Sequence, residues 1–148
     1  MIYKVFIDEI AYALEDHAFG NRWFFDFDEQ STVPEIPETD CYPETGHKVL
    51  VIDPIPSRDS FQIMEDFVDV VTDKADQEKL YVALSQRHPF SSFNDMLHYT
   101  NQRENWFAYK NERMKEVVEE WMEEYGVVFK DGCVSCDSED IFEYDRDE

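Results

Sequence analysis

Hydrophobic and polar residues alternate along short segments of the chain, and alternation with a period of two is typical of half-buried β-strands. The clearest segments are RWFFDFD (22–28) and HKVLVID (47–53), which we expect to pair antiparallel, with VVFK (127–130) as a candidate third strand. Residues 29–46 hold three prolines, one glycine and five acidic residues without a basic one. This composition predicts an extended acidic loop between the first two strands.

Elsewhere apolar residues recur at three- and four-residue steps, the period of an amphipathic helix. This spacing predicts helices over 8–17, 59–71, 75–86 and 91–99, followed by a long helix that starts after Asn101 and ends at Gly126. Asp8 is the expected cap of the first helix, and Asn101 with Glu104 forms the expected capping box of the last. The predicted fold class is therefore α+β: a small antiparallel sheet packed by about five helices.

The long helix has an apolar stripe that predicts a buried side. The stripe consists of Phe107, Met114, Val117, Val118, Trp121 and Tyr125. Trp106 and Tyr109 lie off its centre, which makes them candidates for an aromatic contact surface. The opposite side carries six glutamates: Glu112, Glu116, Glu119, Glu120, Glu123 and Glu124. A row of carboxylates on a rigid helix could bind a basic partner or imitate the phosphates of DNA, whereas the alternative is a solvated helix face.

The charge of the chain narrows the kinds of partner. The 148 residues include 35 acidic and 13 basic ones, for a net charge of -22. Such an excess argues against direct nucleic-acid binding, which needs lysine and arginine to displace phosphate counterions, and against an anionic membrane surface. A basic protein partner fits better. The last eighteen residues, 131–148, carry a net charge of -7 and few apolar residues, which predicts an acidic mobile tail after a single domain at 1–130.

Location follows from what the sequence lacks. No stretch approaches the roughly 18 apolar residues of a membrane span, and acidic residues interrupt the first segment where a signal peptide needs an apolar run. The cysteines Cys41, Cys133 and Cys136 are odd in number, which favours reduced thiols. We therefore expect a cytoplasmic protein.

Motifs for catalysis and metal binding are weak. Cys133 and Cys136 lack a second ligand pair and the βαβ context of a redox motif, so reduced thiols are preferred over a zinc site or a redox pair. The acidic group Asp26, Asp28 and Glu29 lacks the spacing of a calcium loop, and a solvated strand end is preferred. The histidines, at 17, 47, 88 and 98, are scattered, and no glycine-rich phosphate-binding motif is present. No catalytic, cofactor-binding or metal-binding residue is therefore assigned.

Three segments of the chain together resemble a family of small bacterial proteins, the uncharacterised protein family UPF0158. They are SFQIMEDFVDVV (60–71), LYVALSQRHPFSSFNDML (80–97) and ENWFAYKNERMKEVVEEWMEEYGV (104–127), and FFDFDEQSTV adds to the likeness. The resemblance covers most of residues 6–128, and the tail from Asp131 lies outside it. Relatives often have basic residues around the Phe90-x-x-Phe93 segment, where this chain has Ser91, Ser92 and Asn94. The resemblance implies a fold and domain limits, but no activity.

These observations favour a non-catalytic domain for protein–protein interaction or regulation. The acidic surface is its expected binding feature, and a basic protein is its expected partner. Two alternatives stay open at this point. One is a DNA-mimic inhibitor of a DNA-binding protein, and the other is an enzyme or metal-binding protein of an unrecognised kind.

Overall fold

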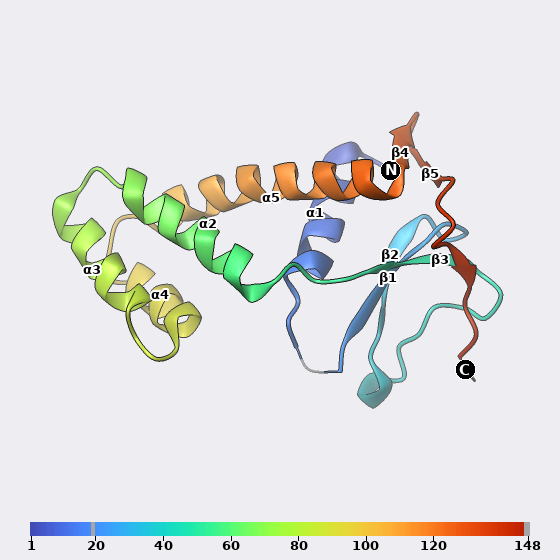
Figure 1. Cartoon of the computed structure of the whole chain (residues 1–148), viewed down its shortest axis with the longest axis horizontal. Coiled ribbons are helices and arrows are strands. Elements are labelled where there is room, and N and C mark those ends of the chain that lie inside the picture. The colour runs from blue at the N-terminus through green and yellow to red at the C-terminus, as the bar shows by residue number, and fades with distance from the viewer. Residues whose placement is uncertain (19, 147–148) are drawn as a thin grey trace. The chain divides into compact units, whose positions relative to one another are not determined.

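The structure is a computed structural model that describes residues 1–18 and 20–146 (Figure 1). Its five helices and small antiparallel sheet confirm the α+β class. The chain forms two compact units, one of Met1–Ile55 with Lys115–Glu148 and the other of Pro56–Met114. The helices are α1 (Tyr3–Glu15), α2 (Ser57–Val70), α3 (Lys74–Leu84), α4 (Pro89–Leu97) and α5 (Arg103–Tyr125). The strands are β1 (Arg22–Asp26), β2 (Ser31–Glu35), β3 (Lys48–Ile52), β4 (Val127–Lys130), β5 (Cys133–Cys136) and β6 (Phe142–Glu143), with a short 3-10 turn at Pro37–Thr39. The single-domain limits of 1–130 stay a prediction.

The first unit is built on a four-stranded sheet in the order β2-β1-β3-β6, and each neighbouring pair is antiparallel. The predicted pairing of the first two candidate strands is confirmed, with Phe25 opposite Leu50. Phe25 contacts Phe6 of α1 edge to face, at 5.7 Å between ring centroids. Phe24 points to the other side of the sheet and packs on Tyr144 at 5.4 Å. Strand β1 is therefore buried on both faces rather than on one.

Two segments near the N-terminus differ from their predictions. Helix α1 begins at Tyr3, and Asp8 does not cap it but pairs with Lys4 one turn earlier, at 2.8 Å. The predicted loop 29–46 contains strand β2, which pairs with β1 along its whole length. Pro34 is compatible with this strand because β2 lies at the edge of the sheet, where one side of the backbone needs no hydrogen-bond donor.

The C-terminal segment also differs from its prediction. VVFK forms a strand, β4, but it pairs with β5 in a separate hairpin instead of joining the sheet. Asp131 and Gly132 make its turn with φ of 54° and 76°, as a two-residue hairpin loop of this sequence does. The residues beyond them are not a loose tail, because Val134 and Tyr144 are 2% and 4% exposed. Two apolar side chains buried in the first unit hold this segment in place; residues 147–148 of the predicted tail lie outside the described residues.

The second unit packs α2, α3 and α4 against the first part of α5. Its centre is aromatic: Trp106 lies 5.3 Å from Phe67 and 5.0 Å from Phe93 between ring centroids. The predicted capping box of α5 is replaced by buried Asp76, which accepts hydrogen bonds from the Asn101 backbone N–H and the Gln102 side chain. This carboxylate ties the start of α5 to α3.

Helix α5 buries the predicted stripe except for Phe107, and near its start it buries a second stripe that was not predicted. Near its start the buried or half-buried positions include Gln102, Trp106, Tyr109 and Arg113; further on they include Met114, Val118, Trp121 and Tyr125. Lys110, Val117 and Met122 are half-buried beside them. Both series advance by three or four residues, but the second is one residue out of step with the first. Phe107 is in step with the second series only, and it is 45% exposed.

Candidate functional site

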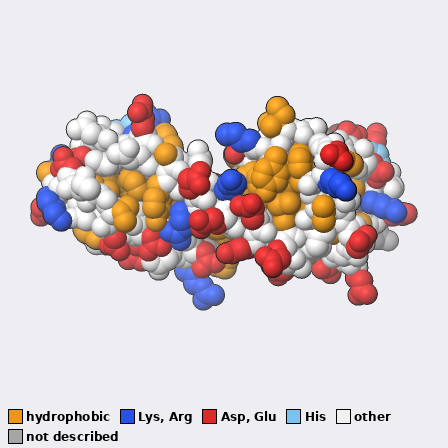
Figure 2. Space-filling model, turned by 90° about the horizontal axis from the view of Figure 1, so that it is seen from above, with side chains coloured by type: hydrophobic (Ala, Val, Ile, Leu, Met, Phe, Trp, Pro, Cys, Tyr) orange, Lys and Arg blue, Asp and Glu red, His pale blue; other side chains and the backbone are white. Residues whose placement is uncertain are grey.

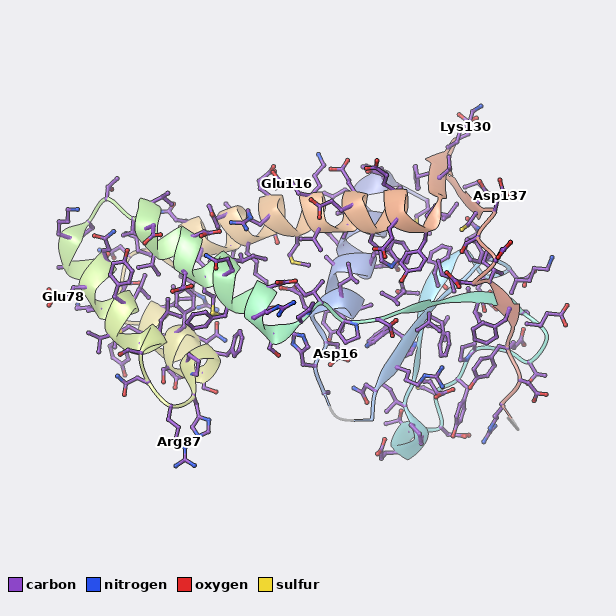
Figure 3. All side chains as sticks on the ribbon, in the orientation of Figure 1. Asp16, Glu78, Arg87, Glu116, Lys130 and Asp137 are labelled. Atoms are coloured by element: carbon purple, nitrogen blue, oxygen red, sulfur yellow. The ribbon has the colours of Figure 1, made fainter. Side chains whose placement is uncertain are left out.

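The six glutamates predicted as a binding face are all exposed. We call them the glutamate face of α5; Glu112 belongs to the second unit and the other five to the first. Glu116 is labelled on the outer side of the helix in Figure 3. Only Glu119 has a described side-chain partner, the hydroxyl of Tyr3, which donates to it at 3.2 Å. No lysine or arginine within the described residues forms an ion pair with this face.

The glutamate face is electrostatically unfavourable for the helix that carries it. Glu112, Glu116 and Glu120 follow one another at four-residue steps, and Glu119 and Glu123 repeat this spacing. Each such pair of like charges costs a few tenths of a kcal/mol. The last turn of α5 has no basic residue to offset the negative end of the helix dipole. The helix is therefore held by its buried side, through Val118 and Trp121, and not by its exposed one.

Acidic side chains also dominate the surface more widely. The space-filling view shows more Asp and Glu than Lys and Arg side chains on the visible face, with hydrophobic side chains between them (Figure 2). None of the helices in the described part of the chain is long and apolar enough to cross a membrane. The glutamate face is thus one part of a generally acidic surface.

The predicted aromatic contact is not formed as expected. Trp106 is only 3% exposed because it is enclosed by Phe67 and Phe93 in the second unit. Tyr109 is half-buried, and its hydroxyl accepts a hydrogen bond from Arg113 at 2.8 Å. Arg113 also pairs with Asp66 at 2.9 Å, and this bond lowers the pKa of the Asp66 carboxyl. Trp106 is therefore a core residue of the second unit, and a contact surface that includes Tyr109 stays a prediction.

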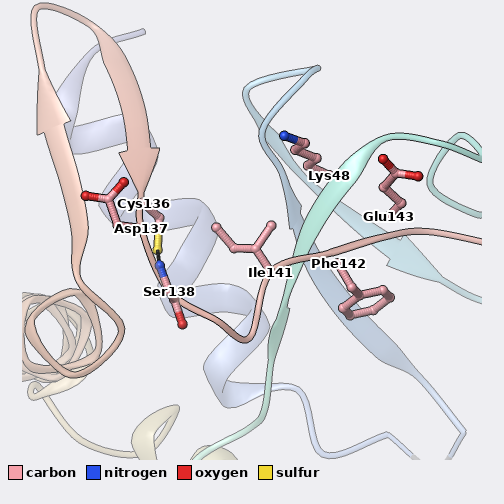
Figure 4. Close-up of a pocket in the computed structure, with 7 residues that line it drawn as sticks. All are labelled: Lys48, Cys136, Asp137, Ser138, Ile141, Phe142 and Glu143. Atoms are coloured by element: carbon pink, nitrogen blue, oxygen red, sulfur yellow. Dashed lines mark hydrogen bonds between the residues drawn. The ribbon is translucent and has the colours of Figure 1, made fainter.

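The cysteines do not come together. All three are free thiols, and Cys133 and Cys136 sit at the two ends of β5. The Cys136 thiol donates to the Tyr125 carbonyl at 3.0 Å and accepts from the Ser138 backbone N–H at 3.4 Å. Cys136 also lines a pocket of about 350 Å³ with Lys48 and residues of the C-terminal segment (Figure 4). Its lining combines one lysine with acidic, hydroxyl and apolar groups and does not single out a ligand.

A cluster around His47 is the feature that sequence reasoning missed. Strands β1 and β3 pair with Asp26 opposite Val49, so His47 comes to lie beside the turn that follows Asp26. The Nδ1–H of His47 donates to Oδ2 of Asp26 at 2.8 Å. Its Nε2 lies 2.8 Å from Oε2 of Glu44. Asp28 and Glu29 bring further carboxylates within reach.

Asp26 organises this cluster from within the protein. Its side chain is fully buried, and Oδ1 accepts the backbone N–H groups of Asp28 and Glu29, both at 2.9 Å. Asp26 thereby shapes the turn and orients the imidazole of His47. The hydrogen bond to Asp26 raises the pKa of His47, and the charge of Glu44 adds to this effect. Asp26, Asp28 and Glu29 are close in the sequence, whereas His47 is distant from them and comes near only through the strand register.

Comparison with known proteins agrees with the resemblance noted from the sequence. The model of an uncharacterised protein family, UPF0158, matches residues 4–138, so the likeness extends past Asp131, where we had expected it to end. A UPF0158 protein of Pseudomonas aeruginosa is 29% identical over 126 residues, which cover 80% of each chain. No solved structure matches. The family match spans most of the chain, and the protein belongs to the uncharacterised protein family UPF0158.

Proposed function

We propose that this protein is a non-catalytic interaction or regulatory domain that binds a basic protein through the glutamate face of α5. The observation that carries the proposal is that these carboxylates are exposed and have no basic partner within the described chain. A partner's lysines or arginines would relieve the repulsion between them. Relief of this repulsion would thus favour binding, and the free protein cannot obtain it without a partner.

The glutamates of the first unit are held on a rigid support. Val118 and Trp121, on the opposite side of the same helical turns, are 0% and 6% exposed. A side chain fixed to a packed helix loses less freedom on binding than one on a loop. This support favours Glu116, Glu119, Glu120, Glu123 and Glu124 as the centre of the interface.

The proposal also covers the kind of partner and the compartment. A DNA-binding protein is one kind of basic partner, and it would make the face a DNA mimic; competition by duplex DNA for the same partner distinguishes that case. We place the protein in the cytoplasm, and the three free thiols support this location because such compartments keep cysteines reduced.

The test is capture of proteins from a lysate on the immobilised chain at low and at high salt. Electrostatic contacts between exposed charges weaken as the Debye length falls from about 10 Å at 0.1 M salt to about 3 Å at 1 M. We therefore expect basic proteins to be retained at low salt and released at high salt. Retention that does not change with salt, or a retained set without basic proteins, would contradict the proposal.

A further inference from the structure

The second feature with chemistry of its own is the His47 cluster, and it is independent of the proposed function. It contains two groups of three potential metal ligands that share His47: Asp26 with Asp28, and Glu29 with Glu44. In each group the nitrogen and carboxylate oxygen atoms lie within 4.8 Å of one another. The imidazole distinguishes this cluster from the acidic patches elsewhere on the protein, because a neutral imidazole is a common metal ligand.

The hydrogen bonds decide between the two groups. Asp26 already accepts three hydrogen bonds, from two backbone N–H groups and from Nδ1–H of His47. Asp28 accepts the backbone N–H of Lys48 at 2.7 Å. Both carboxylates therefore already stabilise the folded backbone through these hydrogen bonds. Glu29 and Glu44 are exposed and can move toward an ion with little cost to the structure.

The bond to Asp26 also determines which nitrogen of His47 is available. A carboxylate can only accept, so Nδ1 carries a proton, and in the neutral imidazole Nε2 offers its lone pair to the side of Glu44. In metal sites a ligating histidine almost always donates its other ring N–H to a carboxylate or carbonyl, which orients the ring. Buried Asp26 has this role here. A lone pair 2.8 Å from a carboxylate oxygen is a repulsive contact unless a positive ion lies between them, either a proton or a metal.

We propose that Nε2 of His47 and the carboxylates of Glu29 and Glu44 bind a divalent transition metal such as Zn²⁺. One imidazole with two carboxylates is a donor set of the kind zinc accepts, whereas Ca²⁺ and Mg²⁺ prefer oxygen ligands alone. Two negative ligands match the ion's charge. Three protein ligands leave a coordination position for water or for a group supplied by another molecule.

Calorimetric titration of the chelator-treated protein with Zn²⁺ at one fixed pH tests this site. We expect one saturable equivalent in the parent. The double variant Glu29→Gln and Glu44→Gln should bind Zn²⁺ at least about tenfold more weakly, because it lacks two of the three ligands. The double variant Glu116→Gln and Glu120→Gln removes the same number of charges from α5 and should leave the affinity for Zn²⁺ unchanged. The variant Cys41→Ser, Cys133→Ser and Cys136→Ser should also bind as the parent does.

NMR of the parent gives a readout that does not depend on any variant. Zinc should shift the Nε2 resonance of His47 strongly and leave its Nδ1 proton bound to Asp26. Absence of saturable binding would overturn the proposal and leave a proton as the ion between His47 and Glu44. Equal losses in the two charge-matched variants would overturn it as well, because general attraction to an acidic surface would then explain the binding. Loss in the cysteine variant would assign the ion to thiols instead.

Discussion

Trp106 and Phe107 are neighbours on α5, yet their environments are opposite. Trp106 is 3% exposed, and Phe107 is 45% exposed with the Arg103 guanidinium over its ring. The helical period alone allows either residue to face inward, depending on which later residues it is compared with. Contact with Phe67 and Phe93 determines the choice, and those side chains come from other helices.

This difference gives a prediction for stability. Trp106→Ala should lower the free energy of unfolding by about 3–5 kcal/mol, because it leaves a cavity among aromatic rings. Phe107→Ala should change it by less than about 0.5 kcal/mol, as an exposed substitution does. Urea unfolding followed by circular dichroism measures both values. Similar losses in the two variants would show that the aromatic assignment on α5 is wrong.

At the scale of elements, α1 protects the open edge of the sheet. Strand β2 pairs with β1 on one side only, and an unpaired edge is a risk for association with other strands. Pro34 has no N–H to offer there, and the Thr32 backbone N–H is bonded to Glu9 of α1. The other carboxylate oxygen of Glu9 is buried without a partner. The Glu9 side chain thus protects the edge of the sheet, but burial of its unpartnered oxygen is unfavourable.

Glu9→Gln tests this arrangement through its pH dependence. Burial raises the pKa of Glu9, so the native state binds its proton more tightly than the unfolded chain does. Stability should therefore fall as pH rises from the ordinary glutamate pKa of about 4.3 up to the raised value. Glutamine keeps the acceptor for Thr32 and removes the charge. The variant should be at least as stable as the parent at pH 7 and should lack this fall.

Urea unfolding at pH 4 and pH 7 gives the comparison. Glu38→Gln, at an exposed glutamate of the same unit, is the control and should keep the parent's pH dependence. If Glu9→Gln is less stable than the parent at pH 7, the Glu9 carboxylate is stabilising and the account of this edge is incorrect.

The elements that the sequence could predict are those with a strong local pattern. Alternation in 22–28 and 47–53 predicted β1, β3 and their pairing, and helical spacing predicted the five helices. Strand β2 was missed because its sequence, STVPE, does not alternate and because the prolines and acids of 29–46 are typical of a loop. The Asp131-Gly132 turn did carry a hairpin signal, but the acidic composition around it suggested disorder instead.

At the scale of the whole molecule, acidic residues fall into a buried set and an exposed set. Some are absorbed by the fold, such as Asp26 and Asp76, which are 0% and 6% exposed and bind backbone N–H groups. Others, as on the glutamate face, remain exposed. The exposed set was predictable because it depends on one helix. The His47 cluster was not, because it depends on the end of β1, the turn that follows it and the loop before β3.

The most direct test of the proposed function compares two charge-matched variants in their capture of basic proteins. Glu116→Gln, Glu120→Gln and Glu123→Gln remove three charges from α5, and Asp137→Asn, Glu139→Gln and Asp140→Asn remove three from exposed positions near the C-terminus. If the glutamate face binds the partner, the first variant should lose the proteins that the parent retains at low salt, while the second keeps them. Equal retention by both variants would contradict the account and leave the face as a solvated surface.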